Sequence, residues 1–165
     1  MQELASRSYG DLEMTRTPTA IGTTINSADR PSRRTRRGIA TVEIVVGVGA
    51  VYGGYSLLTD AEGLGAKQDW LEGSVFSDYT VPGLFLLVVI GGGMLAAATV
   101  TMLAPAYAAR AAGIMAAVLV AWGAVETVTI GWRGTGQLVL VGAFVAAPAL
   151  VLGAFSVRSL RRKLV

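Results

Sequence analysis

The sequence contains no cysteine and no histidine. Without these side chains the chain cannot form disulfides, use a thiolate nucleophile, or build the zinc, copper and haem sites that need imidazole or thiolate ligands. A catalytic triad based on histidine is excluded as well. Only carboxylate, lysine, tyrosine and hydroxyl chemistry remains, and no arrangement of these residues in the sequence forms a catalytic motif. We therefore expect no cofactor, no metal and no enzymatic activity.

Charged residues are also scarce, at 15% of the chain, whereas hydrophobic residues make up 53%. The apolar residues occur in blocks of about 20, which is typical of helices that face lipid. The net charge of +3 could indicate nucleic-acid binding. However, the basic residues lie beside the apolar blocks, where they orient a membrane protein. We expect the lipid bilayer, and not nucleic acid, to be the partner of this chain.

Four apolar segments are long enough to cross a membrane as helices. The clearest, Val81 to Leu103, lies in a run without charge, and as a helix it rises about 34 Å across a hydrocarbon core of about 30 Å. The sequence therefore predicts an all-α membrane protein, with a bundle of four transmembrane helices over residues 38–157. The expected helices cover about 39–58, 81–104, 108–131 and 138–157, and the last is expected to bend near Pro148. The polar, Arg-rich tail 1–37 is expected to be disordered, and a basic tail, 158–165, follows the bundle.

Basic residues are unevenly distributed between the two sides of this bundle. Ten of them fall between Arg30 and Arg37, in the second connection and in the C-terminal tail, whereas the other side has only Lys67 and Arg133. Because positively charged flanks stay in the cytoplasm, both termini are predicted to be cytoplasmic. We expect a multi-pass protein of the plasma membrane, which is the inner membrane of a bacterium.

Two glutamates, Glu43 and Glu126, lie within the predicted helices, where an acid costs roughly 2.5–3.5 kcal/mol at the bilayer centre. At 1.5 Å per residue their depths differ by about 15 Å, so they cannot share a proton or a metal ion. Glu43 lies near the cytoplasmic end. We expect it to reach toward the headgroups and to meet the arginines Arg33 to Arg37, or Arg110. The alternative is that Glu43 is a proton site.

A polar cluster is predicted at the opposite end of the bundle. Four residues follow spacings of four, three and four along one side of the third helix: Trp122, Glu126, Thr129 and Arg133. The chain order brings Asp78 and Tyr79 to about the same depth. We expect Arg133 to neutralise Glu126 or Asp78. The cluster of Asp78, Tyr79, Glu126 and Arg133 either holds the helices in register or forms a shallow outward-facing pocket for a cation or a polar headgroup.

One connection, residues 59–80, is long and acidic, with five carboxylates against Lys67 alone. We refer to it as the acidic connection. Its apolar residues Trp70, Leu71, Val75 and Phe76 are interpreted as a short interfacial helix that anchors the connection among the headgroups. The alternative is a small lid or binding loop.

Glycines mark the faces by which the helices are expected to pack. In the first helix, Gly49 and Gly53 form a GxxxG spacing, and Ala50 and Gly54 form an overlapping one. Three more glycines fall near the middle of the second helix: Gly91, Gly92 and Gly93. They make room for a neighbouring helix or allow a bend. Such faces also suit a homo-oligomer or assembly into a larger membrane complex.

Two stretches of the chain carry a resemblance to known proteins: FSDYTVPGLFLLVVIGGG (76–93) and WGAVETVTIG (122–131). In these stretches the chain resembles small four-span membrane proteins of uncharacterised function from actinobacteria. Within them, five residues match the features of that group: Asp78, Tyr79, Pro82, Gly83 and Glu126. The resemblance covers residues 40–157 in topology, and it implies a bacterial inner membrane without implying a particular activity.

The leading functional prediction is a non-enzymatic structural or accessory subunit of a membrane complex. The alternative is a small proton-coupled transporter that uses Glu43 or Glu126. A carrier should lose transport when the glutamate becomes glutamine, whereas a packing role should tolerate that change.

Overall fold

The computed structural model describes residues 31–63, 65–74, 76–130 and 141–161, and their regular structure is entirely helical. Within these residues, four segments are long and apolar enough to cross a membrane: Arg33–Thr59, Thr80–Leu103, Ala108–Thr129 and Gly142–Arg161. The predicted all-α class and the four helices are thereby confirmed. Most of the predicted disordered tail, residues 1–30, lies outside the described residues.

Helix α1 covers Arg33–Thr59 and begins before the predicted start at residue 39. Ser32 caps it, because its hydroxyl oxygen accepts a hydrogen bond from the Thr35 amide at 3.1 Å. Arginine is a good helix former, and neither proline nor glycine interrupts the run Arg33 to Arg37. That part of the sequence, assigned to the tail from its composition, therefore belongs to the first helix.

The second span is one continuous helical rod of three parts: α2 (Thr80–Leu84), the π-helix η3 (Phe85–Gly92) and α3 (Gly93–Leu103). Pro82 lies in its first turn, where the missing amide proton costs little. The rod ends at Leu103, and the turn Ala104–Tyr107 that follows is closed by a hydrogen bond from the Tyr107 amide to the Ala104 carbonyl, at 2.9 Å.

The third span is α4 (Ala108–Ile130), and the fourth consists of the π-helix η4 (Gly142–Ala146) and α6 (Ala147–Arg161). The irregularity predicted near Pro148 takes the form of η4, in which the Ala147 amide bonds to the Gly142 carbonyl. Proline lacks an amide proton and clashes with the carbonyl four residues earlier. A wider turn directly before Pro148 relieves that clash.

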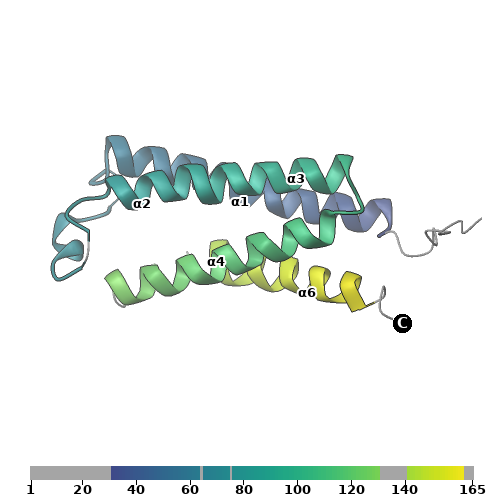
Figure 1. Ribbon diagram of the computed structural model, residues 1–165. Coiled ribbons are helices and arrows are strands. Elements are labelled where there is room, and N and C mark those ends of the chain that lie inside the picture. The colour runs from purple at the N-terminus through teal and green to yellow at the C-terminus, as the bar shows by residue number, and fades with distance from the viewer. Residues whose placement is uncertain (1–30, 64, 75, 131–140, 162–165) are drawn as a thin grey trace, which may run out of the picture.

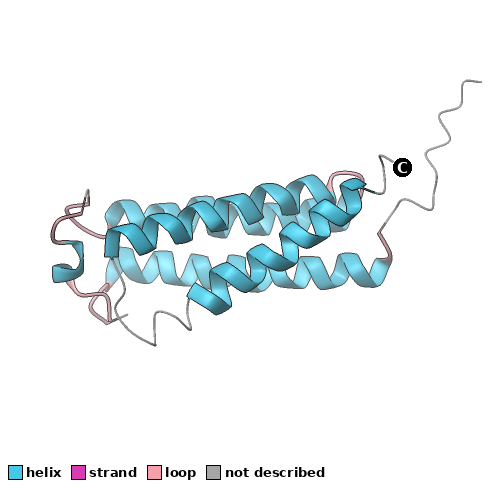
Figure 2. Ribbon diagram, turned by 90° about the horizontal axis from the view of Figure 1, so that it is seen from below, coloured by secondary structure: helices cyan, strands magenta, loops and turns pink. Residues whose placement is uncertain are grey.

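The four spans form two antiparallel pairs. Helix α1 packs along α2, η3 and α3, and α4 packs along α6, while the pairs meet mainly where α3 contacts α4. Figure 1 shows α4 lying close to α3 near the turn Ala104–Tyr107 and moving away from the second span toward the opposite end. We call these the turn end and the connection end, because Figure 2 shows the acidic connection beyond the second of them. The start of α1 and the end of α6 both lie at the turn end.

The first pair packs through glycines that allow close backbone approach. A Cβ atom on Gly54 would lie 2.6 Å from the Leu87 amide nitrogen and 2.7 Å from the Gly83 carbonyl oxygen. A Cβ atom on Gly91 would lie 2.6 Å from a methyl carbon of Val51. Helices α1 and η3 therefore touch almost without intervening side chains.

The glycine face differs in part from the predicted one. The fully buried small residues of α1 are Ala40, Gly47, Ala50 and Gly54, so the overlapping Ala50-xxx-Gly54 motif lies on the packed face. Gly49 and Gly53 are partly buried, and a Cβ atom on either would lie 3.2 Å from a side chain of another helix, Phe144 or Leu86. One residue along a helix turns the face by about 100°. Gly49 and Gly53 instead line a cavity.

The three glycines of the second span that were predicted to pack also face in different directions. Gly91 faces α1, and a Cβ atom on Gly93 would lie 3.0 Å from Met115 of α4. Gly92 is exposed, and a Cβ atom there would meet nothing within 4 Å. The prediction that Gly92 packs against a helix of this chain is therefore wrong.

Candidate functional site

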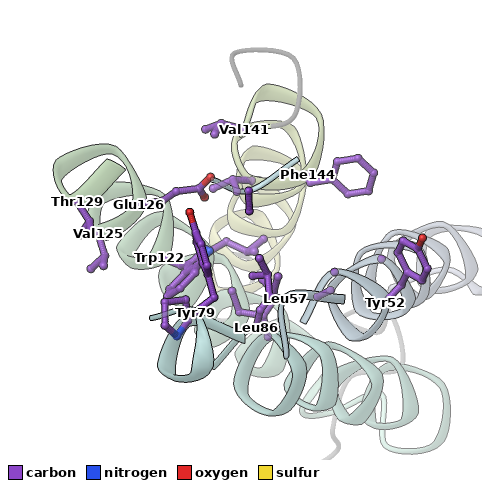
Figure 3. Close-up of a pocket in the computed structure, with 18 of the residues that line it drawn as sticks. Tyr52, Leu57, Tyr79, Leu86, Trp122, Val125, Glu126, Thr129, Val141 and Phe144 are labelled. Carbon is purple, nitrogen blue, oxygen red and sulfur yellow. The ribbon is translucent and has the colours of Figure 1, made fainter. Parts of the chain in front are cut away.

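A cavity of about 690 Å³ lies between the two helix pairs at the connection end. Its walls come from α1, the second span, α4 and η4, and the acidic connection supplies further lining residues. Most of these side chains are apolar or aromatic. Figure 3 shows Tyr52 and Phe144 on one side of this space and Trp122 and Glu126 on the other.

The acidic connection covers part of this cavity. Trp70, Leu71, Phe76 and Tyr79 line it, and Leu71 and Tyr79 are only 4% and 6% exposed. The Tyr79 hydroxyl donates a hydrogen bond of 2.7 Å to the Lys67 carbonyl oxygen, which ties the start of the second span to the middle of the connection.

A second tie in the connection joins the Gln68 side-chain amide to the Ser77 carbonyl oxygen at 2.7 Å. The predicted short helix is present as the 3-10 helix η2 (Gln68–Leu71). Leu71 is buried and Trp70 and Phe76 are partly buried, so these residues pack inward, as in the lid interpretation. Val75, which belonged to the predicted anchor, lies outside the described residues.

Glu126 projects from α4 toward this space and is half-buried (Figure 3). Trp122 and Thr129, at the predicted helical spacings, line the same cavity. Within the described segments, no hydrogen bond or ion pair to the Glu126 carboxylate is found. The expected partner, Arg133, lies outside them.

The aromatic ring of Trp122 is held in place next to Glu126. It stacks on Phe85 of η3, with the ring centroids 4.8 Å apart and the planes inclined by 15°. Stacked rings at this distance attract each other beyond the effect of area burial. The contact links the two helix pairs beside the cavity and fixes the position of the indole.

Asp78 does not belong to the cavity, although it was predicted to join the cluster. Its side chain is exposed, and its Oδ1 atom accepts a hydrogen bond of 2.8 Å from the Thr80 amide. That bond holds the pKa of Asp78 below its ordinary value of 3.8, because it favours the ionised form. Asp78 therefore accepts a hydrogen bond from the first amide of α2 and does not line the cavity. Of the four predicted cluster residues, the cavity brings together Tyr79 and Glu126.

Glu43 lies outside this cavity, in the contact between α1 and α3. Its side chain is fully buried, with an exposed fraction of 0%. The Thr101 hydroxyl donates a hydrogen bond of 3.3 Å to Glu43 Oε1, whereas Oε2 has no partner in the described part of the chain. The prediction that Glu43 meets the arginine cluster is wrong, since the carboxylate turns into the packed face that also contains Val46 and Gly47.

No family model, curated protein or solved structure matches the chain. Within the described segments, no group of three or more carboxylates is placed to hold a metal ion. Two features of the molecule bear on its function: the partly covered cavity with Glu126, and the buried Glu43.

Proposed function

We propose that the protein is an integral membrane protein that binds a small organic molecule, without converting it chemically, in the cavity between its helix pairs. The observation that most directly supports this proposal is the half-buried Glu126, which lacks a partner among the described residues and faces a cavity of about 690 Å³. Sites for drug-sized molecules typically measure about 300–1,000 Å³ and combine apolar walls with a few polar groups. A carboxylate in an apolar setting is costly, and a bound ligand would compensate it.

We also propose that the turn end faces the cytoplasm and that the cavity opens on the outer side of a bacterial inner membrane. The start of α1, with its arginines, and the end of α6 share the turn end (Figure 1). The acidic connection occupies the opposite end. The positive-inside rule supports this orientation.

Two matched variants test the binding function. Gly49 lines the cavity, and a Cβ atom there would lie 3.2 Å from the Phe144 ring, so Gly49→Leu places a side chain at the cavity wall. Gly92→Leu introduces the same side chain where a Cβ atom meets nothing within 4 Å. All three proteins are purified in mild detergent, compared for thermal stability, and analysed by native mass spectrometry for bound small molecules.

We expect a small-molecule adduct on the wild type and on Gly92→Leu, and its loss from a stably folded Gly49→Leu protein. The predicted role as a structural or accessory subunit is the competing proposal. It would be supported by a stable partner protein and no small molecule on the wild type, and that result would contradict the binding function.

A proton-coupled carrier is the second candidate, and Glu43 favours it. A fully buried carboxyl group with one unpartnered oxygen has no described positive charge beside it, and burying an uncompensated charge is costly. We propose that Glu43 carries a proton in this arrangement and releases it when α1 and α3 separate. Proton uptake by proteoliposomes, driven by a ligand gradient, should be lost in Glu43→Gln. Equal uptake by both proteins would remove Glu43 from the coupling.

A further inference from the structure

We infer that the ligand of this cavity is an organic cation with an apolar body. The inference depends on the proposed binding function and adds the charge class of the ligand. Among the described residues that line the cavity, Glu126 is the only acidic or basic one. A ligand that fills this space therefore meets one negative group in otherwise apolar surroundings.

The aromatic lining suits a cation as well. Six aromatic side chains among the described residues border the space, including Trp122 and Tyr79 close to Glu126 (Figure 3). The electron-rich faces of such rings attract cations, more strongly when water is excluded. Because Trp122 is fixed against Phe85, no ordering of that indole is needed when the ligand binds.

Neutral and anionic ligands fit this site less well. A neutral molecule would displace water from Glu126 without replacing the lost solvation, and an anion would be repelled by it. The acidic connection above the cavity adds five carboxylates against Lys67, and a surface of one sign raises the local concentration of ligands of the opposite sign. The charge of the acidic connection and that of Glu126 in the wall thus favour the same class of molecule.

The test uses two probes of the same shape. (2-Naphthylmethyl)trimethylammonium carries a fixed positive charge, and 2-neopentylnaphthalene is its neutral carbon isostere. Binding to the full-length protein in lipid nanodiscs is measured by titration calorimetry and by quenching of tryptophan fluorescence, with empty nanodiscs as the control for partitioning into lipid. The variants are Glu126→Gln and, as the blocked cavity, Gly49→Leu.

We expect the wild type to bind the cation at least about 30-fold more tightly than the isostere, since breaking a buried charge pair commonly costs more than that factor. Glu126→Gln should bind the two probes within about threefold of each other. Equal binding of both probes by the wild type would overturn the cation inference and leave the binding function standing. That result is expected if Arg133 neutralises Glu126, which is one of the two partners that the sequence predicts for Arg133, the other being Asp78.

Failure of the proposed function gives a different result. In that case neither probe binds to the wild type above the empty-nanodisc signal, and Gly49→Leu changes nothing. The comparison of the two probes on the wild type needs no variant. It therefore decides the inference even if Glu126→Gln does not fold.

Discussion

Gly54 is the position where one added methyl group perturbs the packing of the first helix pair most directly. In Gly54→Ala the new Cβ atom would lie 2.6 Å from the Leu87 amide nitrogen and 2.7 Å from the Gly83 carbonyl oxygen. Both are backbone atoms, so no side-chain rotation relieves the contact. Helix α1 and the second span must separate by about 0.8 Å to reach an ordinary contact of 3.4 Å.

Two opposing effects set the magnitude. Overpacking of this kind costs typically 1–3 kcal/mol, and we expect the upper half of that range because backbone atoms are involved. The change from glycine to alanine also stabilises a helix by up to about 1 kcal/mol. The net loss of unfolding free energy in Gly54→Ala should therefore be about 1–2 kcal/mol. Gly92→Ala gains only the second effect, since it faces open space.

The assay is reversible unfolding in mixed micelles, followed by circular dichroism, for the wild type and both alanine variants. The predicted order of stability is Gly92→Ala, then the wild type, then Gly54→Ala. If Gly54→Ala were as stable as Gly92→Ala, the close approach of α1 to the second span would be refuted.

Three further predictions concern the acidic connection and the buried acid. Tyr79→Phe removes the hydrogen bond to the Lys67 carbonyl, worth about 1 kcal/mol, so trypsin should cleave after Lys67 roughly fivefold faster in a timed digestion. The pKa of Asp78 is lower in the folded protein than in the unfolded chain. Ionised Asp78 therefore stabilises the fold at pH values above the pKa of the unfolded chain, and this stabilisation is lost as the pH falls through the lowered pKa of the folded protein. Between about pH 5 and about pH 2 the thermal midpoint should fall less in Asp78→Asn than in the wild type. If Glu43 is protonated, Glu43→Gln should change the unfolding free energy by less than about 1 kcal/mol. Glu43→Ala leaves a void and leaves the Thr101 hydroxyl unpaired, so it should lower the unfolding free energy by about 2–4 kcal/mol.

The spans could be predicted from the sequence because bilayer thickness alone dictates their length. The packing faces of the helices could be predicted less reliably than the spans, since the small residues of α1 form two overlapping stripes. The position of Glu43 could have identified which stripe of α1 packs. Its spacing of four and seven residues from Gly47 and Ala50 puts it on the stripe that packs, with Val46 beside it, and away from lipid and headgroups.

The candidate site was predictable only in part. The spacing of Trp122, Glu126 and Thr129 indicated one polar face of the third helix, and all three line the cavity. The cavity itself lies where α4 diverges from the second span, which depends on three-dimensional packing and leaves no local pattern. Asp78 was assigned to the cluster by depth, although an aspartate two residues before a helix amide is better explained as part of the helix start.

Accessibility of the α4 face tests the central claim, which is an open cavity beside Glu126 on the outer side of the membrane. Because the chain has no cysteine, a single introduced cysteine can be labelled without a signal from any other thiol of the protein. Thr129 lines the cavity, whereas Val128, one residue earlier, is 85% exposed on the outer surface of the bundle, where lipid is expected. A membrane-impermeant thiosulfonate reagent applied to intact cells should label Thr129→Cys at least tenfold faster than Val128→Cys. Equal rates at the two positions, or no labelling of Thr129→Cys from outside, would contradict the account.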